Sequence, residues 1–207
     1  MRFSTVRSLA GLAVAALLFT SAFAADDGFK PLFNGKDFTG FDFVMSGSAD
    51  PAKTWSVKDG VIDCTGKPNG YIVTKDSYSN YVLQVDIRYP EQAGNSGFLI
   101  NCTGDPKVWP TCIEVQGHYN SICAIFPIGG AKGPRPPVDE AARKKAIKPH
   151  NEWNTVEIRV QNGAITSMLN GVKICESEPY ELKKGPIGFQ SEGVPVQFRN
   201  MRIKELN

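Results

Sequence analysis

Two Asn-Gly pairs constrain the fold of this chain more than any other feature of its sequence. Asn162-Gly163 and Asn170-Gly171 each separate short runs in which apolar and polar residues alternate. An Asn-Gly pair between alternating runs is the strongest short-range signal of a β-hairpin, because a type I′ turn needs positive φ at both central residues. The sequence therefore predicts a meander of three antiparallel strands over residues 154–175.

Most of the remaining chain has the pattern of short strands broken by turns. Tyr81–Tyr89 alternates cleanly between apolar and polar side chains, as a half-buried strand does. We expect further strands at Trp55–Val57, Val61–Cys64, Tyr71–Thr74, Gly97–Asn101, Ile113–His118, Ile187–Gln190 and Val196–Lys204. Because no long helix interrupts them, the sequence predicts an all-β fold, either an antiparallel β-sandwich or a barrel.

Residues 129–150 are the exception to this pattern. They begin with Gly and Pro and continue with DEAARKKA, whose acidic start and basic end suit a short helix. A connection of this length inside a compact β domain is often a lid or a binding loop. A solvated excursion without a role fits the sequence equally well.

The start of the chain is typical of a secretory signal peptide. Arg2 and Arg7 precede an apolar stretch at residues 10–19, and Ala22-Phe23-Ala24 fits an A-x-A cleavage site. The apolar stretch is too short for a comfortable membrane span. We therefore expect residues 1–24 to be removed and the protein to be exported to the periplasm or the extracellular space.

Cleavage after Ala24 would leave residues 25–207 as a single domain with no membrane attachment. It would also remove Arg2 and Arg7, which together account for the formal net charge of +2. A mature chain without net charge gives no reason to expect nucleic acid or an anionic membrane as a partner.

The cysteines leave two arrangements open. Their number, five, means that at least one has no partner within the chain. An exported chain can form disulfides, and a bridge among Cys102, Cys112 and Cys123 is one alternative. The other is a set of buried apolar thiols that also includes Cys64 and Cys175.

One predicted strand carries the candidate chemistry. Glu114, Gln116 and His118 alternate with apolar residues in the stretch TCIEVQGHYN. Alternate residues of a strand share a face, so one face would pack on the core while the other presents a carboxylate, an amide and an imidazole. We expect these three residues to be catalytic. The alternative for Glu114 is a solvated carboxylate, or one paired with Arg199.

Several fragments occur in the order that is typical of one family. They are FKPLFNGKDFTGF, TWSVKDGVIDCTGKPNGYIVT, GNSGFLI, CIEVQ, NEWNTVEIRVQNGAITSMLNGVKI, GPIGFQSEG and VQFRNMRIKEL. Together they resemble the 3-keto-disaccharide hydrolase domain family over about residues 29–205. The resemblance implies a concanavalin A-like jelly roll of two antiparallel sheets, with an enzyme activity on glycosides oxidised to a ketone at C3 of the sugar.

A 3-keto sugar suggests a specific mechanism. The ketone acidifies the C2 hydrogen, so a base can form an enolate whose collapse expels the C1 substituent; water can then add to the unsaturated product. Glu114 or His118 would be the base, and Gln116, Asn95 or Arg199 would hold the enolate oxygen. We expect no cofactor; a divalent metal held by Glu114 and His118 is an option that no metal motif demands.

Other residues are candidates for binding a sugar, although turn, core or surface roles are the alternatives. They are Asn95, Ser96, Arg199, Trp109, Tyr119 and His150. Two other functions suit the same scaffold: a carbohydrate-binding module without turnover, and a cell-envelope interaction domain. The aglycone, the anomeric preference, the net outcome as hydrolase or lyase and the oligomeric state stay open.

Overall fold

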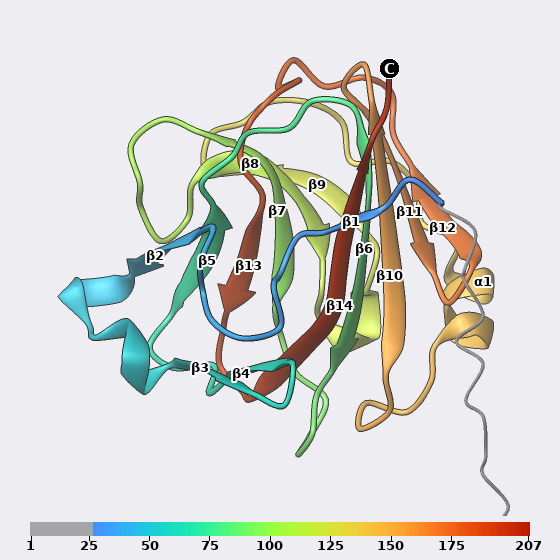
Figure 1. Cartoon of the computed structure of the whole chain (residues 1–207). Helices are drawn as coiled ribbons and strands as arrows, with labels where there is room; N and C mark the ends of the chain where they lie inside the picture. Colours follow the sequence, from blue (N-terminus) through green and yellow to red (C-terminus); the bar gives the residue numbers. More distant parts are fainter. Residues whose placement is uncertain (1–26) are drawn as a thin grey trace, which may run out of the picture.

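The structure is a computed structural model that describes residues 27–207, and it consists of two antiparallel sheets packed face to face (Figure 1). The larger sheet has eight strands: β12 (Val172–Glu176), β11 (Ala164–Leu169), β10 (Asn154–Gln161), β6 (Tyr81–Arg88), β14 (Val196–Glu205), β4 (Val61–Cys64) and β3 (Trp55–Lys58) in spatial order, with β1 (Lys30–Pro31) also paired to β14. The smaller sheet has six: β2 (Phe41–Met45), β5 (Gly70–Thr74), β13 (Gly188–Ser191), β7 (Gly97–Thr103), β8 (Thr111–Gln116) and β9 (Ile125–Ile128). The predicted all-β sandwich of the jelly-roll type is confirmed.

The meander predicted from the two Asn-Gly pairs is present as β10, β11 and β12. At the first turn φ is 53° at Asn162 and 88° at Gly163; at the second it is 49° at Asn170 and 83° at Gly171. Both turns therefore have the left-handed backbone that a type I′ hairpin requires.

The predicted short helix is also present, as α1 (Glu140–Ala146). It begins where the Asp139 side chain accepts a hydrogen bond of 2.8 Å from the backbone N–H of Ala142. Short 3-10 turns lie at Ser46–Ser48, Pro51–Lys53 and Tyr119–Ser121.

The boundaries of two strands differ from the prediction. β8 ends at Gln116, so the expected strand over Ile113–His118 is too long, and His118 instead begins the 3-10 turn at Tyr119–Ser121. β9 has no counterpart in the prediction because Pro127 interrupts its pattern. It lies at the edge of its sheet, which is where a strand tolerates proline.

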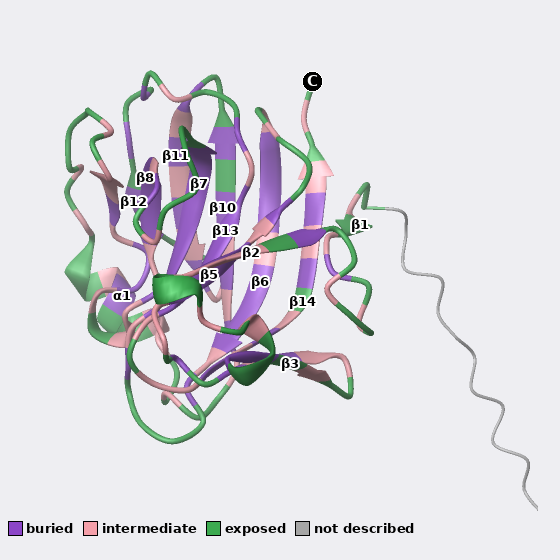
Figure 2. Cartoon of the chain, turned by 90° about the vertical axis from the view of Figure 1, so that its left-hand side faces the viewer, coloured by how far each residue is buried: buried purple, intermediate pink, exposed green. Residues whose placement is uncertain are grey.

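The core lies between the two sheets and is dominated by aromatic and β-branched side chains. Phe98 and Phe189 from the smaller sheet meet Phe198 from the larger one with ring centroids 5.9–6.4 Å apart in edge-to-face arrangements. Figure 2 shows the buried segments running along strands of both sheets. These contacts hold the sheets together and fix which face of each strand points outward.

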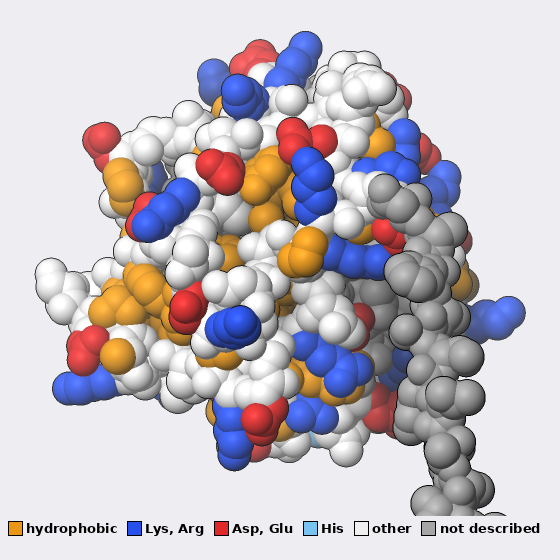
Figure 3. All heavy atoms as spheres, viewed as in Figure 1, with side chains coloured by type: hydrophobic (Ala, Val, Ile, Leu, Met, Phe, Trp, Pro, Cys, Tyr) orange, Lys and Arg blue, Asp and Glu red, His pale blue; other side chains and the backbone are white. Residues whose placement is uncertain are grey.

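Basic and acidic side chains are interspersed over the face of the molecule that Figure 3 shows. Within residues 27–207 no helix is long and apolar enough to cross a membrane. The predicted signal peptide at residues 1–24 lies outside the described residues and stays a prediction.

All five cysteines lie in the described part of the chain, and each is a buried free thiol. The structure therefore has the second of the two cysteine arrangements, and the bridge among Cys102, Cys112 and Cys123 is not formed.

Candidate functional site

Glu114 lies on the outer face of the smaller sheet, turned away from the core. Strand alternation places its neighbours Ile113 and Val115 in the core, each fully buried. On the outer face Glu114 is opposite Leu99 of β7 and Phe126 of β9. Although it faces outward, Glu114 is only 5% exposed, because side chains from neighbouring strands surround it.

A glycine makes room for this buried carboxylate. A Cβ atom at Gly97 would lie 2.6 Å from Oε1 of Glu114 and 2.4 Å from Oε1 of Gln190. The absence of a side chain at Gly97 thus lets the carboxylate of β8 and the amide of β13 extend over β7. Gln190 is 1% exposed, and neither its nitrogen nor its oxygen has a hydrogen-bond partner among the described residues.

A pocket of about 330 Å³ opens beside Glu114. Its lining residues are Asn95, Trp109, Glu114, Gln116, Phe126, Ile128, Gly129 and Glu192. Glu192 follows β13 and is half-buried, so the pocket contains a second carboxylate that the sequence interpretation did not identify. A small concave site with a few convergent polar groups is where small ligands bind.

The environment raises the pKa of both carboxyl groups, Glu114 and Glu192. Burial, followed by the negative charge of Glu192, raises the pKa of Glu114 to about 7, while the amide of Gln190 and the cation of Arg135 act in the opposite direction. Burial also raises the pKa of Glu192, against lowering effects from Asn95 and from a charge at His118. A carboxyl group that exchanges its proton near neutral pH is suited to general acid–base catalysis.

Gln116 and His118 do not form one polar row with Glu114 as the sequence predicted. Gln116 lines the pocket, and its Oε1 accepts a hydrogen bond of 2.7 Å from the backbone N–H of His118. His118 lies beyond the end of β8 and does not line the pocket; its Nδ1 accepts a hydrogen bond of 3.2 Å from the N–H of Asn120. The imidazole is nevertheless close enough to affect the pKa of Glu192.

The GNSG turn contributes one residue to the pocket and one to its support. Asn95 lines the pocket, and its Oδ1 accepts a hydrogen bond of 3.0 Å from the N–H of Ser96. Ser96 is fully buried, and its hydroxyl donates a hydrogen bond of 2.8 Å to the carbonyl of Gln190. Ser96 therefore fixes β13 beside Glu114 rather than facing a ligand.

Of the aromatic and histidine candidates for sugar binding, only Trp109 lines the pocket, and it is 38% exposed. Tyr119 donates a hydrogen bond of 3.0 Å to the carbonyl of Lys148. Nδ1 of His150 lies 2.9 Å from the carbonyl oxygen of Tyr89, and the rings of Tyr119 and His150 meet edge to face at 6.1 Å. Both side chains anchor the loop that follows α1, and neither lines the pocket.

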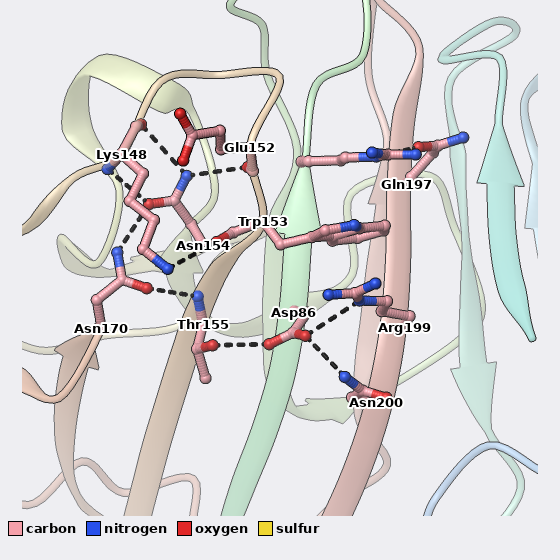
Figure 4. A network of polar contacts seen from close by, with 11 residues as sticks. Asp86, Lys148, Glu152, Trp153, Asn154, Thr155, Asn170, Gln197, Arg199 and Asn200 are labelled. Carbon is pink, nitrogen blue, oxygen red and sulfur yellow. Dashed lines mark hydrogen bonds and ion pairs between the residues drawn. The ribbon is translucent and has the colours of Figure 1, made fainter. Parts of the chain in front are cut away.

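Arg199 lies on the opposite side of the sandwich. It belongs to β14 and points away from the core, with its Nε 3.2 Å from the carboxylate of Asp86 and its guanidinium stacked 4.2 Å from the ring centre of Trp153 (Figure 4). The structure therefore brings Arg199 neither to the pocket nor to Glu114, and the pairing considered between Arg199 and Glu114 is wrong.

No metal site is apparent in the described residues. No group of three or more His, Cys, Asp or Glu side chains gathers as a ligand set within residues 27–207. The metal held by Glu114 and His118 therefore stays a prediction.

Two of the residues that the sequence interpretation missed, Gln190 and Glu192, had a detectable signal. Gln190 ends the predicted strand Ile187–Gln190 and Glu192 lies two residues further on, so an extended backbone places both on one face, as it does Glu114 and Gln116. No such signal existed for Phe126, because β9 itself was not predicted.

The fold and the site together define a class: a two-sheet β-sandwich with a carboxylate-lined pocket on one outer face. The carbohydrate-binding module CBM66 from Bacillus subtilis is 14% identical, with a TM-score of 0.57, 82% of this chain covered and 98% of that one. A galectin-like protein of unknown function from Bacillus subtilis is 12% identical, with a TM-score of 0.59 and coverages of 86% and 94%. At these identities the likeness establishes the fold alone.

The chain belongs to the family of the 3-keto-alpha-glucoside-1,2-lyase-like domain, whose family model matches residues 28–204. The family resemblance seen in the sequence is thereby confirmed. A protein from Parabacteroides distasonis ATCC 8503 that is named "putative glycosyl hydrolase" is 26% identical, with a TM-score of 0.66, 87% of this chain covered and 94% of that one. No curated protein matches the chain.

Proposed function

We propose that this protein is an enzyme that cleaves 3-keto-glycosides in the pocket beside Glu114. The observation that carries the proposal is the buried carboxyl group of Glu114, whose pKa is raised to about 7 in a pocket that contains a second carboxylate. Such a group can accept and return a proton at neutral pH, which elimination from a 3-keto sugar requires. Membership of the 3-keto-alpha-glucoside-1,2-lyase-like family supports the choice of substrate.

In the proposed reaction Glu114 removes the proton from C2 of the sugar, and the electron pair moves into the C3 carbonyl to give an enolate. When the enolate collapses, a double bond forms between C1 and C2 and the C1–O bond breaks. The leaving oxygen takes a proton, for which protonated Glu114 is the nearest source. Addition of water across the double bond would turn this elimination into a net hydrolysis.

Further pocket residues would assist. Asn95 is bridged to Glu192 and lies two residues from Gly97, which pairs with Gln116, so the two amides and Glu192 lie at the same end of the pocket. Since Oε1 of Gln116 already accepts the N–H of His118, its Nε2 is the group left to donate a hydrogen bond to the enolate oxygen. Glu192, with its raised pKa, would be a second proton donor or acceptor.

The test is incubation of the purified protein with a 3-keto-glucoside in deuterated water. Deuterium at C2 of the product, or an unsaturated intermediate, is the expected result. Glu114→Gln should lower kcat by about 10²–10⁴-fold, the range for loss of a general acid–base group. Glu178→Gln, a change at an exposed glutamate outside the pocket, is the matched control. Cleavage without C2 exchange would contradict the mechanism, and sugar affinity without any turnover would favour a binding module.

The proposal includes export, because the predicted signal peptide precedes the domain. Expression in a bacterial host followed by N-terminal sequencing of the periplasmic or secreted protein should give a chain that begins at Ala25. A full-length chain retained in the cytoplasm would contradict this part of the proposal.

A further inference from the structure

The pocket beside Glu114 has two ends of different chemistry. β8 and β9 run side by side, with Cys112 opposite Ile128 and Glu114 opposite Phe126, and Gln116 lies further along β8. At about 3.3 Å per residue, the outer-face positions from Cys112 to Gln116 span roughly 13 Å. The pocket is therefore elongated along the strands, and Glu114 lies near its middle.

One end of the pocket is polar and acidic. Asn95, Gln116 and Glu192 line it beyond Glu114. Amide and carboxyl groups are suited to the hydroxyl groups of a sugar ring, so the ring that carries the ketone belongs at this end.

The other end is apolar. Trp109 and Ile128 line it, and Phe126, opposite Glu114, extends the apolar lining to the middle of the pocket. Among the described residues the only large hydrophobic side chains that are exposed are Trp109, at 38%, and Val172, at 41%. An exposed tryptophan at the mouth of a pocket offers a flat apolar face to a ligand.

The loop that carries Trp109 is tied to the end of β9. Thr111 donates a hydrogen bond of 2.7 Å from its hydroxyl to the carbonyl of Gly129. A Cβ atom at Gly129 would lie 2.0 Å from the carbonyl oxygen of Pro110, so only glycine allows the two segments to approach so closely. Because of this contact, the residue before Pro110 is held beside Ile128 at the apolar end.

The outer side of this end also carries a cation. The guanidinium of Arg135, from the long loop before α1, stacks 4.8 Å from the ring centre of Phe126. The stacking covers part of Phe126 and leaves Trp109 as the most accessible ring of the apolar end.

We propose that Trp109, Phe126 and Ile128 form the subsite for the leaving group, and that this subsite selects a flat aromatic ring. The inference rests on the proposed function, since it places the sugar at the polar end and the bond to be broken beside Glu114. A flat ring stacks on Trp109, whereas a methyl group is too small to cover the indole face.

The experiment compares two 3-keto-glucosides whose leaving groups are methanol and 2-naphthylmethanol. Both are alkyl alcohols, so differences in leaving-group acidity stay small. The 2-naphthylmethyl substrate should have the higher kcat/KM. Trp109→Ala should lower its kcat/KM about tenfold more than that of the methyl substrate, and Trp109→Phe should keep most of the preference.

Val172→Ala is the matched control, because it shortens the other exposed large hydrophobic residue, on β12 of the other sheet. It should leave the ratio of the naphthylmethyl and methyl rates unchanged. Equal losses with both substrates in Trp109→Ala, or a kcat/KM of the methyl substrate at least as high as that of the 2-naphthylmethyl substrate, would overturn the subsite.

Failure of the subsite and failure of the proposed function are separable. If the wild-type protein turns over neither substrate, the proposed function is wrong, and equilibrium binding of the 2-naphthylmethyl compound by calorimetry then tests the subsite alone. Weaker binding by Trp109→Ala than by wild type and by Val172→Ala supports it; equal binding overturns it.

Discussion

Both outer faces of this sandwich carry a buried carboxylate, but the two carboxylates differ in their hydrogen bonding. On the larger sheet Asp86 accepts hydrogen bonds from Thr155 at 2.7 Å, from Asn200 at 2.8 Å and from Arg199 at 3.2 Å (Figure 4). On the smaller sheet Glu114 is beside an amide, Gln190, that has no hydrogen-bond partner among the described residues. The carboxylate of Asp86 thus accepts three hydrogen bonds from side chains, whereas burial of Glu114 is poorly compensated and raises its pKa.

Cavity size alone would favour the outer face of the larger sheet. A pocket of about 900 Å³ adjoins Asp86, against about 330 Å³ beside Glu114. In the larger pocket the polar side chains already form hydrogen bonds with one another. Besides the hydrogen bonds of Asp86, Gln84 accepts a hydrogen bond from Arg202 and donates one to Glu157. Groups with satisfied hydrogen bonds stabilise a fold, while a buried group that lacks partners points to a ligand or to chemistry.

Substitution of Asp86 should therefore damage stability and spare the site. Asp86→Ala leaves three polar side chains without their shared acceptor and should cost about 3 kcal/mol of unfolding free energy. Urea denaturation measures the cost, with Asp76→Ala at an exposed aspartate as the control. The activity of the folded fraction should not change; loss of activity without loss of stability would assign function to this face and break the comparison.

Substitution of Glu114 should have the opposite effect on stability, and only above about pH 4.5. Native Glu114 keeps its proton up to a pKa of about 7, whereas the unfolded chain releases it near the ordinary value of 4.5. Between these values the native state binds more protons, so the free energy of unfolding falls as pH rises. Glu114→Gln removes this loss and should stabilise the protein by up to about 3 kcal/mol at pH 8.

At pH 4 wild type and Glu114→Gln should be nearly equal in stability, because the carboxyl is then protonated in both states. Thermal or urea unfolding of both proteins at the two pH values measures the difference. Glu178→Gln, at an exposed position, should show no such dependence. If Glu114→Gln is less stable than wild type at pH 8, then Glu114 is a structural carboxylate like Asp86.

The sequence predicted the fold far better than the site, for a physical reason. Alternation and Asn-Gly turns are local patterns, so the meander at residues 154–175 could be located from neighbouring residues alone. The pocket is lined by residues of β8 and β9 and of the loops next to β7 and β13, which meet only after the sheet has formed. Glu114 could be selected from its own strand, whereas the space above Gly97 and the contact with Gln190 could not.

His118 and Arg199 illustrate the two ways in which local patterns fail. The alternation that placed His118 beside Gln116 assumed that the strand continues, but the chain turns after Gln116 and the imidazole accepts a backbone N–H instead. Arg199 does lie on a strand with an outward side chain, as predicted, but its strand belongs to the other sheet. Sequence alternation gives the face of a strand, not the sheet in which the strand lies.

Glu192 offers a finer test, through the pKa of its neighbour. Its negative charge is the second cause, after burial, of the raised pKa of Glu114. Glu192→Gln should therefore shift the acidic limb of the kcat/KM profile to lower pH, by less than the full elevation because burial remains. If the limb does not move, the group that titrates in the profile is not Glu114.

The smallest expected effect concerns Gln190, and it tests whether this buried amide serves the site rather than the stability of the fold. At pH 4, where Glu114 is protonated, Gln190→Leu replaces a buried amide that forms no hydrogen bond of regular geometry by an apolar side chain of similar size, which should stabilise the protein by about 1 kcal/mol. The same change removes a group that lowers the pKa of Glu114, so the acidic limb of kcat/KM should move to higher pH, opposite to the shift in Glu192→Gln. Urea denaturation and the pH profile measure the two effects on the same sample. A gain in stability together with this shift would mean that the smaller sheet gives up stability to tune its carboxyl group, whereas a loss of stability would mean that Gln190 belongs to a satisfied network like that of Asp86.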